Sequence, residues 1–525
     1  MEAVDPAGEF AANLHTLVSH LTERHDDLPT LPTLPAPETV QSTIASLPAT
    51  LPDAGLGTTA TASYLLNDIL PGCLSAQNGP NYFGFVVGGV TPAAQLADIL
   101  VGAYDENVQV TLPGQTAATA IEARVLELVL DLMGVERAKF GGRTITTGAT
   151  ASNVLGMACA REYLYAHSPH LPKDYSFARS GPPSSPNLPS PPIIVLALHP
   201  HFSILKAAAL VGIGSGPNVV HQIPCQEEDE LAFDLAALEK RLAEEKEVGR
   251  GVVVVYGLGE VNTGELGRDP PRVAELCRTY GAWLHIDAAF GGFASVVPEL
   301  RHLVEGMDQA DSLTLDGHKW LNVPYDCGLF YTKSAHALPG VFAPVEAPAY
   351  LTASSTSAGT AGPQDGQVIH EQVPSPLYVN IENSRRFRAL PLLASLMSLG
   401  KDGYRDLIRR NIKFAQSIAT YLHNSPFYDL LNTYPGADAA KQGIIPLNIV
   451  LFAPARGGSL ETGAELANAI NATRRMYVTA TKWRGRGAVR LAVSNWRTGL
   501  GGEEEVKRIV GILEEVMRES GKSGM

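Results

Sequence analysis

The sequence is poor in paired cysteines and in long apolar runs. Its five cysteines are scattered over 525 residues, with no CxxC pair and no zinc-like Cys/His spacing, which argues against a disulfide framework and a structural metal. No apolar run reaches the length of about 18 residues that a transmembrane helix needs, and the acidic N-terminal stretch lacks the features of a secretory signal. The formal charge of −14 argues against nucleic acid or an anionic membrane as the main partner. We therefore expect a cytoplasmic protein that binds a small molecule and no metal.

The length and the changes in composition predict several parts rather than one domain. We expect an N-terminal arm and interface segment over residues 1–95, a large domain over 96–340, a long loop over 341–383 and a small C-terminal α/β domain over 384–525. Residues 28–56, rich in Pro, Thr and Ala, favour an extended arm, with a flexible tail as the alternative. The long loop is expected to be either a lid over a site or a disordered segment.

Short apolar runs alternate with helical patterns between residues 142 and 333. The runs GVVVVYG and PIIVLAL show no period of two, as is typical of strands covered on both faces. Most runs are followed by a segment with helical spacing, such as ASNVLGMACAREYLYAH after RTITTG. This alternation predicts an α/β fold in which helices pack on a mostly parallel sheet of about seven strands. Residues 170–192, rich in proline and serine, predict a surface loop.

Two ionisable side chains follow predicted strands. Asp287 ends the strand within AWLHIDAAF, and Lys319 comes just after the run SLTLDG. Open α/β sheets bind ligands beyond the carboxyl ends of their strands, so we expect both side chains at one pocket. Pyridoxal 5'-phosphate (PLP) needs a lysine amine that forms a reversible imine and a carboxylate that keeps its ring nitrogen protonated. Lys319 and Asp287 meet both needs together, whereas each alone is more often an ordinary surface lysine or strand-end aspartate.

The sequence TTGATASN predicts a binding site for a phosphate group. Gly148, Ala149 and Thr150 lie between a predicted strand and a predicted helix, whose free N–H groups and dipole favour an anion. The hydroxyls of Thr150 and Ser152 add donors, although such a turn taken alone is ordinary. His201, after a further apolar run, is a candidate to stack on the cofactor ring, with a structural loop residue as the alternative.

Six motifs occur in an order that resembles one enzyme family. They are TTGATASN, HFSILKAA, GEVNTGELGRDP, HIDAAFGG, DGHKWLNVPYDCG and SRRFRALPLLASLMSLG. In this order they resemble the group II PLP-dependent amino-acid decarboxylases, the aromatic amino-acid and glutamate decarboxylase kin. The resemblance runs from about Asn81 to the last predicted helix. It implies the type I aminotransferase fold, with a large PLP-binding domain and a smaller C-terminal domain, and a homodimer with the active site at the subunit interface.

The resemblance also implies roles for individual residues. Lys319 would form the Schiff base, Asp287 would pair with the pyridinium nitrogen, His201 would stack on the ring and Ala289 would lie beneath it. The contacts to the phosphate and the ring hydroxyl would come from Gly148, Ala149, Thr150, His318 and Asn262. The chain departs from the best-known members, which carry Gly-Thr-Thr where residues 259–261 are Gly-Glu-Val, and this puts the contact to the ring hydroxyl in doubt.

The residues leave the reaction open between related chemistries. We expect decarboxylation of an L-amino acid, with a lean towards an aromatic or apolar one, because an apolar surround favours loss of CO₂. The alternatives are transamination, decarboxylative oxidation to an aldehyde or another lyase reaction. A non-catalytic binding protein is poorly supported, since Lys319 and Asp287 are both present. Arg490 is the candidate for an aminotransferase-type carboxylate clamp, or else it braces its domain.

The proton donor and the substrate pocket have aromatic candidates. In the decarboxylases that the chain resembles, a loop tyrosine before the SRR segment protonates the carbon that has lost CO₂. Here Tyr378 is the nearest tyrosine, and His370 is its rival. Four aromatic residues are candidates for a substrate pocket or, alternatively, for core packing: Tyr82, Phe83, Phe85 and Tyr104.

Overall fold

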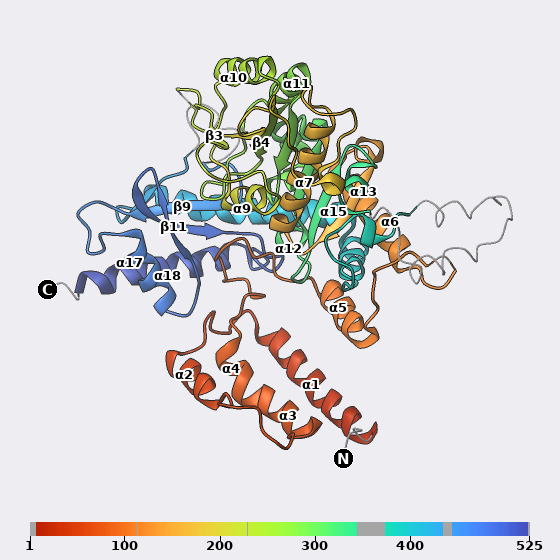
Figure 1. Cartoon of the computed structure of the whole chain (residues 1–525). Coiled ribbons are helices and arrows are strands. Elements are labelled where there is room, and N and C mark those ends of the chain that lie inside the picture. The colour runs from red at the N-terminus through yellow and green to blue at the C-terminus, as the bar shows by residue number, and fades with distance from the viewer. Residues whose placement is uncertain (1–6, 113, 228, 344–372, 434–443, 523–525) are drawn as a thin grey trace. The chain divides into compact units, whose positions relative to one another are not determined.

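The structure is a computed structural model that describes residues 7–112, 114–227, 229–343, 373–433 and 444–522. Backbone contacts divide the chain into two units, Val90–Arg409 and a second unit of Met1–Gly89 with Arg410–Met525. In Figure 1 the second unit includes the red to orange helices labelled α1 to α4 and the blue elements labelled α17, α18, β9 and β11. The predicted loop over 341–383 falls mainly on residues outside the described ones. Among the described residues, none of the helices combines the length and the apolar character needed to cross a membrane.

The unit Val90–Arg409 is built on a seven-stranded sheet. Its strands are β1 (Gly142–Thr146), β2 (Ile193–Ala197), β3 (Val220–Gln222), β4 (Gly251–Gly257), β5 (Trp283–Asp287), β6 (Ser312–Asp316) and β7 (Gly328–Thr332). In the order β1-β7-β6-β5-β4-β2-β3, the pairs of β7 with β1 and with β6 are antiparallel and the other pairs are parallel, so β7 runs opposite to the other strands of this sheet. All five residues of β2 are buried, which explains why its sequence does not alternate. The predicted α/β fold with a mostly parallel seven-stranded sheet is confirmed.

Helices connect these strands and cover the sheet. They are α5 (Pro92–Tyr104), α6 (Ala118–Met133), α7 (Ala149–Ala166), α8 (Phe177–Ser180), α9 (Phe202–Leu210), α10 (Leu235–Glu247), α11 (Pro270–Tyr280), α12 (Gly317–Trp320), α13 (Ala337–Phe342) and the first part of α15 (Ala389–Asn424). Short 3₁₀ turns lie at η2 (Arg137–Lys139), η3 (Gly291–Val296), η4 (Pro298–Val304), η5 (Met307–Gln309) and η6 (Pro376–Tyr378). Figure 1 shows α10 and α11 side by side. Within α15, Gly400 has a non-helical backbone with φ 59°, so the element bends where the sequence predicts the end of one helix.

Helix α7 approaches the sheet closely because it carries a glycine at the contact. A Cβ atom on Gly156 would lie 2.5 Å from the His285 ring, so a larger residue does not fit there. On either side of Gly156 in α7, Leu155 and Met157 share a core cluster with Val195 of β2. Since α7 follows β1 directly, this packing also brings its first two turns next to the carboxyl end of β5.

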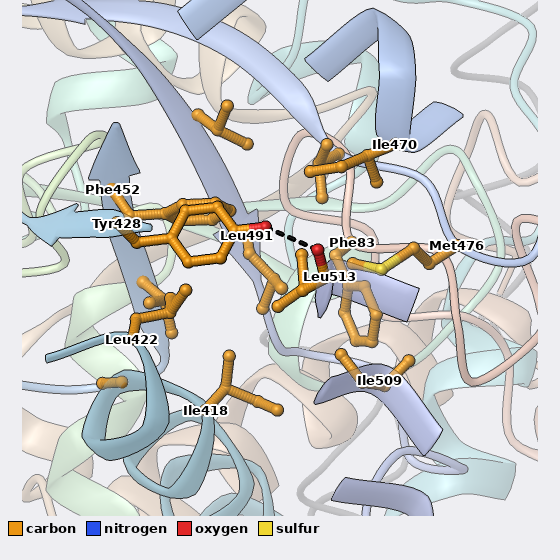
Figure 2. Close-up of a cluster of buried hydrophobic side chains, with 14 of the residues drawn as sticks. Phe83, Ile418, Leu422, Tyr428, Phe452, Ile470, Met476, Leu491, Ile509 and Leu513 are labelled. Atoms are coloured by element: carbon orange, nitrogen blue, oxygen red, sulfur yellow. Dashed lines mark hydrogen bonds between the residues drawn. The ribbon is translucent and has the colours of Figure 1, made fainter. Parts of the chain in front are cut away.

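The unit formed by both chain ends contains a four-stranded antiparallel sheet. Its strands are β8 (Tyr428–Leu430), β9 (Ile449–Pro454), β10 (Thr479–Trp483) and β11 (Arg486–Ala492), in the order β10-β11-β9-β8. Helices α17 (Gly463–Ala472), α18 (Gly502–Lys522) and the second part of α15 contribute to the same core. Figure 2 shows this core, in which Ile418 and Leu422 of α15 lie near Phe452 of β9. The Tyr428 hydroxyl donates to the Leu513 carbonyl at 2.8 Å.

The N-terminal residues of this unit are helical rather than extended. They form α1 (Ala7–Asp27), α2 (Pro37–Ser46), α3 (Thr58–Tyr64), the π-helical turn η1 (Leu65–Ile69) and α4 (Leu70–Cys73). The extended arm predicted for residues 28–56 is therefore wrong over α2. Pro37 lies in the first turn of α2, where a proline has no helical hydrogen bond to lose. The prolines of this stretch bound a helix and do not prevent one.

Candidate active site

A cavity of about 610 Å³ lies at the carboxyl ends of the parallel strands of the unit Val90–Arg409. It is lined by residues of the segments that follow β1, β2, β4, β5 and β6, which lie within 147–151, 198–204, 257–267, 287–290 and 316–319. This edge is where open α/β sheets bind ligands. The volume falls in the range of roughly 300–1,000 Å³ that is typical of small-molecule pockets.

Lys319 lies in α12, one turn beyond the end of β6, and lines the cavity. Its Nζ is 3.0 Å from Asp316 Oδ2, and the other oxygen of Asp316 accepts a hydrogen bond from the Ala149 backbone N–H at 2.7 Å. His318 Nε2 lies 3.6 Å from the same carboxylate. Burial lowers the pKa of His318, so its ring is neutral near pH 7. Asp316 thus joins the lysine to the first turn of α7.

Asp287 ends β5 and lines the same cavity. Its Oδ2 accepts a hydrogen bond from Asn153 Nδ2 at 2.9 Å, and its Oδ1 accepts one from the Ala289 N–H at 3.2 Å. Ala289 also lines the cavity. Both carboxylate oxygens therefore have donors from the protein, and these two hydrogen bonds hold the carboxylate in place.

His201 follows β2 as the N-cap residue of α9 and lines the cavity. Its Nδ1 accepts a hydrogen bond from the Ser203 backbone N–H at 3.2 Å and lies 2.7 Å from Ser203 Oγ. Since Nδ1 is an acceptor, a neutral His201 carries its hydrogen on Nε2. The ring is thus held by its neighbour two residues along the chain.

The turn between β1 and α7 forms another wall of the cavity. Gly148, Ala149 and Thr150 line it, with Gly148 as the N-cap residue of α7. A Cβ atom on Gly328 of β7 would lie 2.5 Å from the Gly148 backbone, so this turn depends on a close approach that only glycine permits. The hydroxyl of Ser152 is 2.7 Å from Thr146 Oγ1, so the structure gives it a partner inside the protein.

The donor set of the cavity fits PLP. An amine for the aldehyde, a carboxylate for the ring nitrogen and the flat ring of His201 surround one space, next to a helix N-terminus with a glycine for the phosphate. Ala149 is the residue whose N–H is engaged with Asp316. The turn is therefore held together by the carboxylate that also contacts Lys319.

Four predicted residues lie apart from the cavity lining or outside the described residues. Asn262 is not among the lining residues, and its amide donates to Glu260 Oε1 at 3.1 Å. Tyr378 ends η6 and does not line the cavity either. His370 lies outside the described residues. Arg490 belongs to β11 of the other unit, where its guanidinium donates to the Phe85 carbonyl, a bracing contact.

The four aromatic candidates for a substrate pocket have different surroundings. Tyr82 stacks on Tyr477 with 4.6 Å between ring centroids, and Phe83 is buried in the core drawn in Figure 2. Phe85 and Tyr104 are exposed. Core packing within its own unit therefore accounts for Phe83, and ring stacking accounts for Tyr82.

Several residues of the site escaped the sequence-based prediction. Glu260 accepts hydrogen bonds from the backbone and side chain of Thr263 and so shapes the loop after β4. Glu265 lines the cavity, its carboxylate 2.7 Å from Arg268, and burial raises its pKa. Asp316 has a sequence signal, since it stands three residues before Lys319 in DGHK and so lies on the same side of a helical turn. The others are recognised only from their neighbours in space.

A lysine and a carboxylate that face one cavity at the carboxyl edge of this kind of sheet are typical of PLP-dependent enzymes. Within that class, the family model described as pyridoxal-dependent decarboxylase conserved domain matches residues 42–434, and the chain belongs to this family. The protein is thus a PLP-dependent carboxy-lyase that acts on an amino acid.

Individual relatives agree with this family. Tryptophan decarboxylase 1 of Oryza sativa subsp. japonica is 25% identical over 504 residues, which cover 93% of this chain and 90% of the relative. The crystal structure of Catharanthus roseus tryptophan decarboxylase with L-tryptophan has a TM-score of 0.77 at 22% identity and covers 99% of this chain and 100% of its own. The Rhodiola rosea 4-hydroxyphenylacetaldehyde synthase structure has a TM-score of 0.76 at 20% identity, with 98% and 99% covered. The two structures show the same fold.

Proposed function

We propose that the chain converts an L-amino acid with an aromatic or apolar side chain into the corresponding amine and CO₂. Lys319 is the attachment point for PLP, and Asp287 is the partner of its ring nitrogen. The observation that carries this proposal is the single cavity that Lys319, Asp287, His201 and the turn 147–151 share. PLP, when bound, accepts the electron pair that remains on Cα when CO₂ leaves.

The protein contributes position, charge and exclusion of water. Asp316 holds the Lys319 amine at the cavity, and Asp287 places a negative charge at its wall. Apolar side chains make up another part of the lining: Leu231, Phe233, Val261 and Phe290. An apolar surround favours departure of a carboxylate as neutral CO₂ and suits an apolar substrate side chain. The relatives that are named tryptophan decarboxylases add support for an aromatic substrate.

Oxidative decarboxylation to an aldehyde is the second candidate. It is favoured by the position of Tyr378, which does not line the cavity and so is not seen to deliver a proton there. In this reaction an amino acid, O₂ and water give an aldehyde, CO₂, ammonia and hydrogen peroxide. One structural neighbour is named an aldehyde synthase, which keeps this outcome in the test.

The test combines cofactor attachment with product analysis. The purified protein with PLP is reduced with borohydride and digested, and we expect the modified peptide to carry the cofactor on Lys319. The protein is then incubated with each of the common amino acids while CO₂, amine, aldehyde, hydrogen peroxide and keto acid are measured. Equal amounts of CO₂ and amine support the proposal. Aldehyde with peroxide supports the second candidate, and keto acid without CO₂ contradicts both.

Asp287→Ala and Asp287→Asn test the nitrogen partner. Removing one member of a buried charged pair costs roughly 2–5 kcal/mol, so we expect turnover to fall by about 10²-fold or more and PLP to bind more weakly. Glu299→Gln is the control, because this carboxylate pairs with Arg409 at the surface and is not among the residues that line the cavity. Full activity in both Asp287 variants would contradict the assignment.

We further propose a homodimer in the cytoplasm. Helix α5 exposes an apolar stripe at helical spacing: Leu96, Ile99, Leu100 and Tyr104. All five cysteines are free thiols, which suits a reducing compartment. Light scattering after size exclusion is expected to give twice the chain mass, and Leu96→Glu with Leu100→Glu to shift it towards the monomer. A monomeric wild-type protein contradicts the dimer, and cell fractionation tests the compartment.

A further inference from the structure

A chain of buried side chains ends on Asp287. The Trp283 indole N–H donates to Ser312 Oγ at 2.9 Å, and this oxygen lies 2.8 Å from His285 Nδ1. His285 Nε2 lies 2.9 Å from Asn153 Oδ1, and Asn153 Nδ2 donates to Asp287 Oδ2 at 2.9 Å. Asn153, His285 and Ser312 have no exposed surface. Water therefore does not compete for these hydrogen bonds, and each donor and acceptor has to be satisfied by its neighbour.

The hydrogen bonds of this series can be donated in only one direction. An indole N–H only donates, so Ser312 Oγ accepts from Trp283. Because His285 Nε2 faces the Asn153 oxygen, a neutral His285 ring carries its hydrogen on Nε2, and its Nδ1 accepts from the Ser312 hydroxyl. Burial lowers the pKa of His285 to about 4, so near pH 7 its neutral ring carries one hydrogen, on Nε2. That hydrogen goes to Asn153 Oδ1, an atom that only accepts. The reversed amide would set the Asn153 oxygen against the Asp287 carboxylate, two acceptors facing each other.

The Asn153 amide reaches a second residue of the site. Asn153 Nδ2 also donates to Ser203 Oγ at 3.0 Å, and Ser203 Oγ lies 2.7 Å from His201 Nδ1. His201 Nδ1 already accepts from the Ser203 backbone N–H, so the Ser203 hydroxyl also donates its hydrogen to His201 Nδ1. One buried amide therefore contacts the carboxylate of Asp287 and, through one hydroxyl, the ring of His201.

We propose that Asn153 and His285 are positioning residues that fix the Asp287 carboxylate at the cavity wall and, through the Ser203 hydroxyl, hold the ring of His201. The proposal rests on the proposed function in one respect, that Asp287 is the partner of the PLP ring nitrogen. A carboxylate fixed beside that nitrogen favours the protonated form of the nitrogen. Neither Asn153 nor His285 lines the cavity, so both act through other residues.

The direction of these hydrogen bonds is tested first in the wild-type protein. ¹⁵N spectra of histidine-labelled protein, recorded with and without PLP, report the hydrogen position on His285, whose signals are assigned by their loss in His285→Gln. We expect a neutral ring with its hydrogen on Nε2 near pH 7. A hydrogen on Nδ1, or a doubly protonated ring, overturns the proposal. This measurement needs no variant to fold other than the one used for assignment.

The effect on Asp287 is tested with three variants of the holoenzyme. Asn153→Ala and His285→Leu break the chain, whereas the amide in His285→Gln is able to accept from Ser312 and donate to Asn153. PLP labelled with ¹⁵N at its ring nitrogen reports whether that nitrogen is protonated. In the two broken variants we expect it to lose its proton near neutral pH, and the PLP dissociation constant to rise about tenfold or more, as for a lost hydrogen bond to a charged group. His285→Gln is expected to resemble the wild type in both measurements.

Asn432→Ala is the matched control. Asn432 is also a buried asparagine, but its amide binds the backbone groups Ile449 O and Leu451 N in the unit formed by both chain ends. We expect this variant to lose stability while the ring nitrogen stays protonated and PLP affinity is kept. If Asn153→Ala and His285→Leu behave like Asn432→Ala, their role is structural and the proposal is wrong.

Asp287→Ala separates the failure of this proposal from the failure of the proposed function. If Asp287→Ala leaves the nitrogen signal and the PLP affinity unchanged, Asp287 is not the nitrogen partner, and the proposed function fails at that residue. If Asp287→Ala changes both while Asn153→Ala and His285→Leu change neither, the positioning role alone fails.

Discussion

The cavity edge of the large sheet and the core in Figure 2 use buried polar groups in different ways. Around the cavity, buried side chains bind one another, as Asn153 binds both His285 and Asp287. In the core of the other unit the labelled side chains are apolar except Tyr428, whose hydroxyl binds the backbone of Leu513. Contacts between polar side chains fix directions and charges, whereas apolar packing fixes the places of whole elements. Substitutions at the cavity should therefore change the reaction more than the stability, and substitutions in the core should do the reverse.

The largest expected effect is that of Lys319→Ala. Without the amine, covalent attachment of PLP is lost, and we expect turnover to fall by roughly 10⁴-fold or more. Thermal unfolding without PLP should change far less than turnover, because Lys319 is not part of an apolar core and its removal affects only its ion pair with Asp316. Lys333→Ala is the matched control, since Lys333 pairs with Asp311 and does not line the cavity. If Lys319→Ala retained turnover, substitutions at the cavity would not be the ones that change the reaction, and the comparison would be wrong.

Leu422→Ala should show the opposite behaviour. Leu422 is completely buried in the core of the unit formed by both chain ends, and removing such a side chain costs about 2–5 kcal/mol of unfolding free energy. Urea unfolding measures this loss, and turnover per correctly folded molecule should stay unchanged. Leu500→Ala, at an exposed position of the same unit, should change neither quantity. An equal loss of turnover and stability in Leu422→Ala would show that the two regions are not separate in their effects.

The pH dependence of stability sharpens the comparison, because His285 belongs to the polar region. Burial lowers its pKa from 6.5 to about 4, so between these values the unfolded chain binds a proton that the folded chain does not. Stability from this residue is present above pH 6.5 and is lost as the pH falls towards 4, on the order of 3 kcal/mol in total. His285→Gln should remove this part of the acid sensitivity in urea titrations at several pH values. Identical pH profiles for both proteins would contradict the burial of a neutral ring.

Tyr428→Phe is expected to have the smallest effect. It removes one hydrogen bond, to the Leu513 carbonyl, and leaves the ring packed beside Phe452. The expected loss is about 1 kcal/mol of unfolding free energy, with no change in turnover. Urea unfolding and an activity assay check both parts. A change in turnover as large as that of a cavity variant would show that this core residue affects the reaction and not only the stability.

Local sequence patterns predicted most of the large sheet. The runs GVVVVYG and SLTLDG correspond to β4 and β6, because a strand covered on both faces needs a continuous apolar run and little else. The conformation of the N-terminal stretch was harder to predict, because its prolines suit an extended chain and the first turn of a helix equally well. The structure has the helix α2 there. Packing of neighbouring segments decides between two such local options.

The sequence by itself determined that Lys319 and Asp287 follow strands of one sheet, and parallel strands deliver their carboxyl ends to the same edge. The partners of these residues were decided by the tertiary structure. Asn153 reaches Asp287 because α7 packs on β5 at Gly156, where a Cβ atom would collide with His285. Such a hydrogen bond joins residues 134 positions apart and depends on distances that no local pattern encodes.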